Sequence, residues 1–332
     1  WVSYFLAWIS SLISFCFNLI SILTAHSFIK NKKPDLIYAS SPQLPAAFIS
    51  LLFAKFINIP FIFEVRDLWP QVLIDQGSGN RENFLIRILK IFEIFLYKNS
   101  NHIFVLSENA IKYIKERGGR KITFLPNGPE LKFFKYYALP KEINGFNLGR
   151  PFKILYTGAH GESNDLKNVL DAAKILDELP IEFNFIGDGT EKEKLQDYAK
   201  NFKNVNFFDP IPKTEIPSIL ATSDAIILSL KNIQVFKYGI SPNKLYDAYA
   251  IGRPVISTVE GSINDEIRKY KVGVTCKGED PRILSETIKE LFYLPRKNRI
   301  QMSKNARLLS EQKYSREIIN KKIYEIINNL IF

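Results

Sequence analysis

The stretch KILYTGAHGES, residues 153–163, is an apolar segment that runs directly into two glycines and a histidine. A short apolar run bounded by glycines is typical of a buried strand. Glycines at its end let backbone N–H groups approach an anion at the start of the following helix. We therefore interpret Gly158, His160 and Gly161 as the first strand-to-helix turn of an anion-binding α/β domain. The alternative is a plain tight turn in which His160 is a helix cap.

Short apolar runs and longer amphipathic segments alternate on both sides of this turn. Strands are predicted at 35–40, 60–65, 102–107, 121–128, 153–158, 181–189, 205–210, 225–230, 254–258 and 272–276, with helical patterns between most of them. Strands that alternate with helices indicate parallel sheets. We expect two doubly wound, Rossmann-like α/β domains, 1–140 and 151–310, the first of them incomplete. The best linker candidate is 138–150, and the last helix, 311–332, could cross back onto the first domain.

The composition is that of a globular chain of 332 residues, 46% of them hydrophobic, which is enough to form the cores of two domains. Cys16 and Cys276 lie far apart and form no Cys/His cluster, so neither a disulfide framework nor a metal site is predicted, and a reducing cytoplasmic setting fits best. Because the sequence opens on Trp1, without a charged leader, we expect its true N-terminus to be missing.

Positive charge is concentrated in the first half of the chain. Residues 1–150 carry 18 Lys and Arg against 10 Asp and Glu, whereas residues 151–332 carry 27 against 24. This bias suits an anionic membrane surface or a phosphorylated substrate. Nucleic acid is not expected, because no nucleic-acid-binding motif is present.

Residues 1–29 hold no charged side chain and are long enough to span a bilayer, but their Ser, Asn and Thr content favours a buried or surface-lying helix.

Polar residues that follow apolar strands are candidates for a ligand site, because ligands of open parallel sheets bind beyond the carboxyl ends of the strands. Such residues occur in both halves, which predicts a cleft between two domains. In FIGDGTEKEKL, 185–195, Gly187 and Gly189 are typical of a nucleotide-binding turn, or equally of a plain turn into a helix.

The segment GISPNKLYDAYAIGRPV, 239–255, is predicted to form a helix that starts near Pro242. Lys244 and Asp247 are three residues apart and therefore share a face. A lysine for phosphate and a carboxylate for ribose hydroxyls would suit a helix N-terminus. The alternative is a surface Lys/Asp pair with no ligand.

The segment FIFEVRDLWP, 61–70, ends a strongly apolar strand in Glu64, Arg66 and Asp67. These charges could form a local ion pair that makes a polar strand end tolerable. Consecutive residues of a strand point to opposite sides, however, so one of them is expected to face the cleft.

Seven motifs, in this order, resemble the retaining nucleotide-sugar glycosyltransferases of family 4, which have the GT-B fold. They are EVRDLWP (64–70), VLS (105–107), LPNG (125–128), YTGAHG (156–161), IGDG (186–189), PIPKTEIPSILATSDAIILSL (210–230) and SPNKLYDAYAIGRPVI (241–256). The chain is particularly similar to bacterial L-fucosamine transferases of O-antigen and capsule synthesis. The resemblance covers nearly the whole chain and implies that the first βαβ portion, with a glycine-rich acceptor loop, is absent.

The resemblance implies an enzyme that moves a sugar from a nucleoside diphosphate, favoured to be UDP, to a lipid-linked or polysaccharide-precursor acceptor with retention. No metal or other cofactor is expected, and the enzyme would work on the inner face of the cell membrane. Arg66 and Asp67 would be catalytic, Lys231 would help to bind the diphosphate, and Asn127 would line the cleft. The implied donor-binding residues are Gly158, His160, Gly161, Gly187, Gly189, Ser241, Lys244 and Asp247.

The chain departs from the pattern of this family in three motifs. A Glu-x7-Glu motif is replaced by Gly239 and Asp247, and Arg66 replaces a histidine. The pair that holds the diphosphate in many relatives, an arginine directly after the position of Gly158 and a lysine some six residues further, is also absent. Arg66 cannot act as a base, so the leaving diphosphate would accept the proton of the acceptor. A GT-B sugar-nucleotide epimerase and a non-catalytic nucleotide-sugar-binding scaffold remain as alternative functions.

Overall fold

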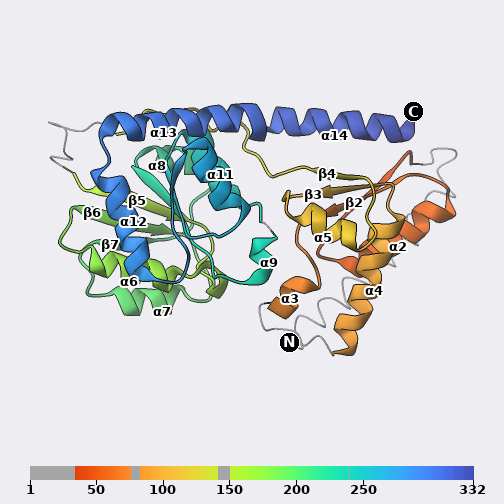
Figure 1. The fold of residues 1–332 in the computed structure, drawn as a ribbon, viewed down its shortest axis with the longest axis horizontal. Helices are drawn as coiled ribbons and strands as arrows, with labels where there is room; N and C mark the ends of the chain where they lie inside the picture. Colours follow the sequence, from red (N-terminus) through yellow and green to blue (C-terminus); the bar gives the residue numbers. More distant parts are fainter. Residues whose placement is uncertain (1–33, 76–82, 141–149, 239) are drawn as a thin grey trace. The chain divides into compact units, whose positions relative to one another are not determined.

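The computed structural model describes residues 34–75, 83–140, 150–238 and 240–332 (Figure 1). These residues form two compact units. One extends to Leu125 and includes Ile323–Phe332, and the other is Pro126–Lys322. Residues 126–140, which the sequence assigned to the first domain, thus belong to the second unit. The predicted helix at 1–29 lies outside the described residues, and within the described ranges no helix is long and apolar enough to cross a membrane.

The first unit contains a four-stranded parallel sheet in the order β1-β2-β3-β4. Its strands are β1 (Ile37–Ser40), β2 (Phe61–Val65), β3 (His102–Val105) and β4 (Ile122–Phe124). The predicted helices form as α2 (Leu44–Phe56), α4 (Phe84–Asn99) and α5 (Ala110–Glu116), and a short helix, α3 (Gln71–Asp75), was not predicted. Asn83 caps α4, because its side chain accepts a hydrogen bond from the Leu85 N–H.

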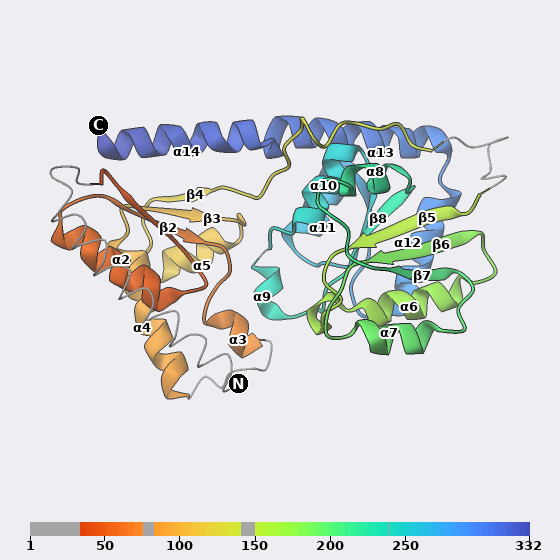
Figure 2. The ribbon, with the colours of Figure 1, turned by 180° about the vertical axis from the view of Figure 1, so that it is seen from behind.

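The second unit contains a six-stranded parallel sheet in the order β10-β9-β8-β5-β6-β7 (Figure 2). Its strands are β5 (Phe152–Thr157), β6 (Ile181–Ile186), β7 (Val205–Phe208), β8 (Ala225–Leu228), β9 (Val255–Ser257) and β10 (Gly273–Thr275). Helices α6 (Leu166–Ile175) and α7 (Lys192–Ala199) lie along one face, and α8 (Ile216–Ala221) and α10 (Asn243–Ile251) along the other. Both sheets are therefore entirely parallel among the described strands, as predicted.

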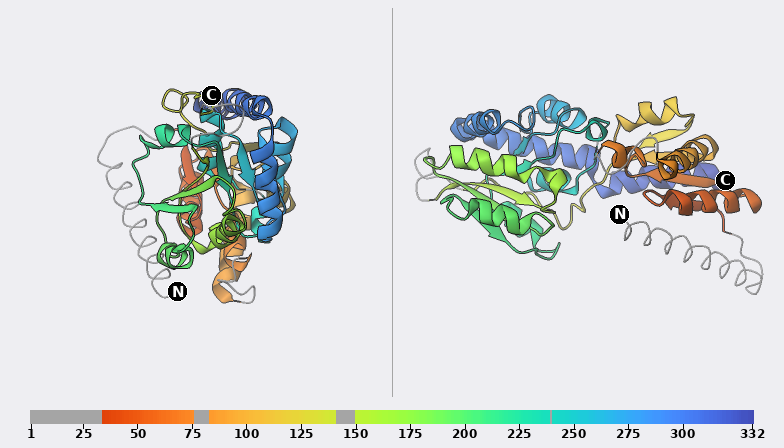
Figure 3. Two further views of the ribbon diagram at one scale, coloured as in Figure 1. Left: turned by 90° about the vertical axis from the view of Figure 1, so that its left-hand side faces the viewer. Right: turned by 90° about the horizontal axis from the view of Figure 1, so that it is seen from below.

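The core of the second unit follows from the alternation along β5. Phe152, Ile154 and Tyr156 point to the face that α6 and α12 (Pro281–Tyr293) cover, and their burial there removes large apolar surfaces from water. Figure 3 shows the same sheet from two further directions, with helices again on both sides.

Two helices of this unit were missed in the sequence. Helix α9 (Gln234–Lys237) has a single turn, and α11 (Ser262–Tyr270) reads SINDEIRKY, in which few apolar residues define a face. The helical tail was predicted and consists of α12, α13 (Arg296–Leu309), a π-helical turn (Ser310–Tyr314) and α14 (Arg316–Ile331).

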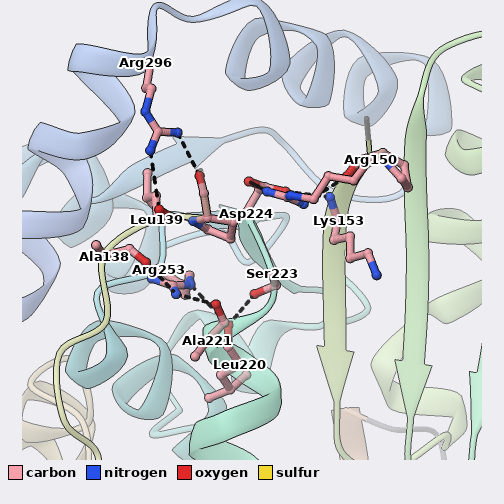
Figure 4. Close-up of polar contacts among 12 residues, drawn as sticks. Ala138, Leu139, Arg150, Lys153, Leu220, Ala221, Ser223, Asp224, Arg253 and Arg296 are labelled. Carbon is pink, nitrogen blue, oxygen red and sulfur yellow. Dashed lines mark hydrogen bonds and ion pairs between the residues drawn. The ribbon is translucent and has the colours of Figure 1, made fainter. Parts of the chain in front are cut away.

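Residues 126–140, called the strap below, are fixed within the second unit by arginines that bind main-chain carbonyls. Arg253 is fully buried, and its guanidinium donates to the carbonyls of Tyr137 and Ala138 as well as Leu220 and Ala221 (Figure 4). Arg296 donates to the next two carbonyls of the strap, those of Leu139 and Pro140. Arg307 donates to the Phe134 carbonyl, and Arg316 donates to the Gly128 carbonyl. A guanidinium suits this role because its five N–H donors lie in a fixed plane.

Candidate functional site

The sheet of the second unit has a topological switch point between β5 and β8. From β5 the chain moves outward through β6 and β7, and it then returns to the other side of β5 to form β8, β9 and β10. The loops that leave β5 and β8 meet there. The Lys231 N–H donates to the Ser163 carbonyl at 3.0 Å, and Lys231 Nζ lies 2.7 Å from Glu162 Oε1. In open α/β sheets this is the position at which ligands bind.

Two glycine loops, 158–161 after β5 and 187–189 after β6, lie in direct backbone contact. Gly158, Gly187 and Gly189 have φ angles of 137°, 149° and 157°. A Cβ on Gly187 would lie 1.9 Å from the Gly158 carbonyl oxygen, and one on Gly189 would lie 2.6 Å from the His160 carbonyl. Gly187 and Gly189 are therefore required by packing, and Gly158 is favoured by its positive φ. Gly161 is different, because a Cβ there would meet no atom closer than 3.7 Å.

His160 is fully buried beneath the first glycine loop, among the rings of Tyr156, Phe185 and Phe207. Among the described residues, its ring nitrogens have no hydrogen-bond partner, so the side chain does not cap a helix. Burial, together with the charges of Lys192 and Lys244, lowers the pKa of His160 to about 4, and the imidazole is neutral at cellular pH.

Lys244, in the first turn of α10, lies beside the first glycine loop. Its Nζ is 3.8 Å from the centre of the Tyr156 ring, and it would be 3.0 Å from a Cβ on Gly158. The Tyr156 hydroxyl donates to the Ala159 carbonyl at 2.7 Å and so ties the ring to this loop. Burial lowers the pKa of Lys244 to about 7. An anion bound against Gly158 would favour the charged ammonium.

Asp247 lies one turn further along α10 and is partly buried. Burial raises its pKa to about 7, against the opposing charges of Lys213 and Arg316. Within the described ranges Lys244 and Asp247 form no ion pair, and burial alone accounts for the pKa shift of Lys244. The two side chains therefore share a face of α10 without bonding to each other.

Ser241 and Asn127 hold the start of α10 through three hydrogen bonds. The Asn127 N–H donates to Ser241 Oγ at 3.0 Å, and Asn127 Nδ2 donates to the Ser241 carbonyl at 2.8 Å. Ser241 Oγ also lies 3.0 Å from the Tyr246 hydroxyl. Asn127 belongs to the strap, so a segment far away in the sequence positions the helix that carries Lys244 and Asp247.

Asp165 is a buried carboxyl near the switch point that the sequence did not reveal. Its φ is 49°, its Oδ2 has no hydrogen-bond partner among the described residues, and burial beside the charge of Glu279 raises its pKa to about 6. It lies directly before α6 and not at the end of a strand, where the sequence pattern draws attention to polar residues. A small hollow at the ends of β8 and β9 lies nearby, lined by Leu230, Lys231, Asn232, Ile233, Phe236, Thr258, Val259 and Glu260.

In the first unit, Arg66 and Asp67 follow β2 and are exposed. The Ser41 hydroxyl, after β1, accepts hydrogen bonds from the Arg66 N–H at 2.9 Å and the Asp67 N–H at 3.3 Å. The Ser41 N–H donates to the Glu64 carbonyl at 2.9 Å. Partial desolvation raises the pKa of the Asp67 carboxyl, and the Arg66 charge lowers it. One hydroxyl thus holds the turn that presents both side chains.

No group of three or more His, Cys, Asp or Glu within the described ranges is arranged to hold a metal ion. Cys276 is buried and free, and burial raises its pKa to about 11.

Two family models match the chain. That of the glycosyl transferases group 1 matches residues 140–309, and that of glycosyltransferase family 4 matches residues 5–133. The putative colanic acid biosynthesis glycosyl transferase WcaI of Escherichia coli is 24% identical over 301 residues, which are 87% of this chain and 74% of that protein. The probable glycosyltransferase WbjE of Pseudomonas aeruginosa is 23% identical over 72% of this chain, and the match spans 61% of its own length.

Solved structures share the fold at low identity. Sucrose-phosphate synthase from Thermosynechococcus elongatus aligns with a TM-score of 0.73 at 15% identity, covering 96% of this chain and 78% of that one. Anabaena HepE in complex with UDP and glucose aligns with a TM-score of 0.71 at 15% identity, covering 94% and 81%. The expected GT-B fold is thereby confirmed.

Proposed function

The chain belongs to the group 1 glycosyl transferases, and we propose that it moves a sugar from a UDP-linked donor to a lipid-linked saccharide acceptor with retention of configuration. The acceptor would be a precursor of a surface polysaccharide, in keeping with the colanic acid assignment in the name of WcaI. The resemblance to L-fucosamine transferases favours an N-acetylated aminosugar as the transferred group.

The observation that carries the donor proposal is the meeting of Lys244 with the Gly158 backbone at the switch point. Lys244 has no carboxylate partner among the described residues, and an ammonium of this kind beside a glycine that leaves its backbone accessible suits a diphosphate. Lys231 is a weaker candidate, because Glu162 already pairs with it. HepE, a structural neighbour of this chain, has been solved with UDP and with UDP-glucose, which supports UDP as the nucleotide.

We assign ribose recognition to Asp247, whose carboxylate would accept hydrogen bonds from the two ribose hydroxyls. Burial raises the pKa of Asp247 because it destabilises the ionised carboxylate. Hydrogen bonds from the two ribose hydroxyls would stabilise that ionised form and offset the effect of burial. His160 is assigned a packing role beneath the glycine loop, since its ring is buried and neutral.

In the proposed reaction the bond between the sugar C1 and the β-phosphate oxygen breaks, and a bond to the acceptor oxygen forms on the same face. The acceptor hydroxyl proton passes to the departing diphosphate, so no protein base is needed. Arg66 would stabilise the developing negative charge, and Asp67 would orient hydroxyls of the sugar or acceptor. Without a bound metal, Lys244 and Arg66 would supply the positive charge.

The proposal is tested by measuring UDP release from a panel of UDP-sugars, with and without a lipid-linked saccharide acceptor. We expect release only when both substrates are present, and Asp247→Ala should weaken UDP binding. If the chain binds UDP tightly but releases no UDP from any UDP-sugar with any acceptor, it is instead a scaffold. Conversion of one sugar nucleotide into another without acceptor would indicate an epimerase.

A further inference from the structure

Helix α4 exposes large apolar side chains on the face opposite to the one it buries. Ile86, Leu89 and Leu96 pack into the core of the first unit, whereas Phe84 and Ile91 are 76% and 64% exposed. The two exposed residues are seven positions apart and therefore lie on one side of the helix. A helix that is apolar on its solvent face as well as its core face is typical of a contact surface.

The charges on this outer face of α4 are all positive. Arg87 and Lys98 are exposed, and their spacing from Phe84 places them on the same side of the helix. The only acidic residue of α4 is Glu93, which is buried among Tyr97, Tyr113 and Arg117. Large apolar and cationic side chains therefore alternate along the helix without an exposed carboxylate.

Helix α2 extends this surface, because it packs side by side with α4. The Phe48 and Phe92 rings stack at 4.6 Å between the two helices, and Lys55 Nζ bonds to the Asn99 side chain near the C-terminal ends of both. Close to this junction Phe56 is 84% exposed. We call the outer face of both helices the α2–α4 surface; its exposed members are Leu52, Lys55, Phe56, Phe84, Arg87, Ile91, Ile94 and Lys98.

We propose that the α2–α4 surface lies on an anionic lipid bilayer, with its aromatic and aliphatic side chains inserted at the interface and its Lys and Arg side chains at the headgroups. Aromatic residues interleaved with cations, without exposed acids, match that environment in both hydrophobicity and charge. A protein partner would not require every exposed charge on two helices to be positive. The inference rests on the proposed function, because a lipid-linked acceptor resides at such a surface.

The experiment is co-sedimentation of the full chain with vesicles of phosphatidylglycerol and phosphatidylethanolamine, compared with vesicles of phosphatidylcholine alone. We expect binding to the anionic vesicles, which the double variant Phe84→Ser/Ile91→Ser weakens about tenfold. Arg87→Gln/Lys98→Gln should weaken it about fivefold for each charge removed. The matched control is Ile283→Ser, which removes an apolar side chain that is 47% exposed in the second unit and should change nothing.

UDP affinity and a thermal melt are measured for every variant and should remain those of the unmodified chain, which shows that both units fold. If Phe84→Ser/Ile91→Ser binds vesicles as well as the unmodified chain does, the assignment of this surface is overturned. It is also overturned if the unmodified chain self-associates and Phe84→Ser/Ile91→Ser does not, because the surface is then an interface between copies. Turnover of a detergent-solubilised acceptor without vesicle binding would refute the surface and leave the transferase function intact.

Discussion

The carboxyl ends of the two sheets carry candidate residues that are held in opposite ways. In the second unit the glycine loops touch backbone to backbone, and burial brings the pKa values of Lys244 and Asp247 to about 7. In the first unit Arg66 and Asp67 are exposed, and a single hydroxyl, Ser41, holds their turn. A site formed by contact between backbones tolerates few changes, whereas an exposed turn can vary its side chains at little cost to the fold.

The largest effect is expected from Gly187→Ala, which should weaken UDP binding about 100-fold and lower the melting temperature. The added methyl group would displace the Gly158 backbone, and a φ of 149° is strained for alanine. Isothermal titration with UDP and a thermal melt measure both effects. The matched control is Gly161→Ala, for which there is space. If both variants bound UDP alike, the contact between the loops would not support the site.

Arg66→Ala should lower kcat about 100-fold, the usual effect of removing a group that stabilises transition-state charge. UDP affinity should stay within about twofold, because Arg66 is assigned to the reaction and not to nucleotide recognition. Steady-state kinetics and UDP titration separate the two quantities, with Arg66→Lys as a variant that keeps the charge. Unchanged turnover in Arg66→Ala would remove Arg66 from the catalytic machinery.

The burial of Lys244 predicts a pH dependence of UDP affinity. Its pKa of about 7 means that the ammonium is charged below pH 7 and increasingly neutral above it, so affinity should fall as the pH rises. Between pH 7.5 and 9 the fall should be about 25-fold, since the charged fraction drops from about a quarter to about a hundredth over this interval. Asp247 is already ionised over most of this range. Titrations at a series of pH values measure the slope.

Lys244→Arg provides the control for this slope, because a guanidinium keeps its charge throughout. UDP affinity of that variant should be nearly constant between pH 7.5 and 9. The same slope in both proteins would show that another group is responsible.

The smallest effect is expected from Ser41→Ala, which removes the acceptor of the Arg66 and Asp67 N–H groups. A loss of about 1 kcal/mol corresponds to roughly a fivefold decrease in kcat, with UDP affinity unchanged. Ser40→Ala is the neighbouring control, because the Ser40 hydroxyl donates to the Ser41 carbonyl and, among the described residues, does not contact the Arg66 or Asp67 N–H. Equal kinetics for the two variants would show that the turn keeps its shape without Ser41.

The sequence predicted the strands and most helices because parallel sheets require apolar runs of characteristic length. It also identified Gly158, Gly187 and Gly189, since glycines after strands are conspicuous. It could not show that Gly187 faces the Gly158 carbonyl, or that Gly161 has room for a side chain, because those facts depend on two loops that meet only in the fold. Helix α11 was missed for a related reason: few apolar residues mark its face.

Contacts between residues far apart in the sequence were also beyond prediction. Asn127 was expected to line a cleft, but both its backbone and its side chain bind Ser241. Lys231 was a candidate for the diphosphate, and its nearest partner is Glu162. The arginines that hold the strap carry no local signal, because their partners are main-chain carbonyls.

The strap has a consequence for building hybrid enzymes that combine an acceptor half from one protein with a donor half from another. The sequence suggests a junction within 138–150, but a hybrid joined there would give this second unit a foreign strap. Arg253, fully buried, would then keep the carbonyls of Leu220, Ala221 and Gly252 but lose those of Tyr137 and Ala138 unless the foreign backbone reproduced them. Each hydrogen bond lost by a buried cation costs about 1.5–3 kcal/mol. The natural place for exchange is between Leu125 and Pro126, so that the second unit is transferred together with its own strap.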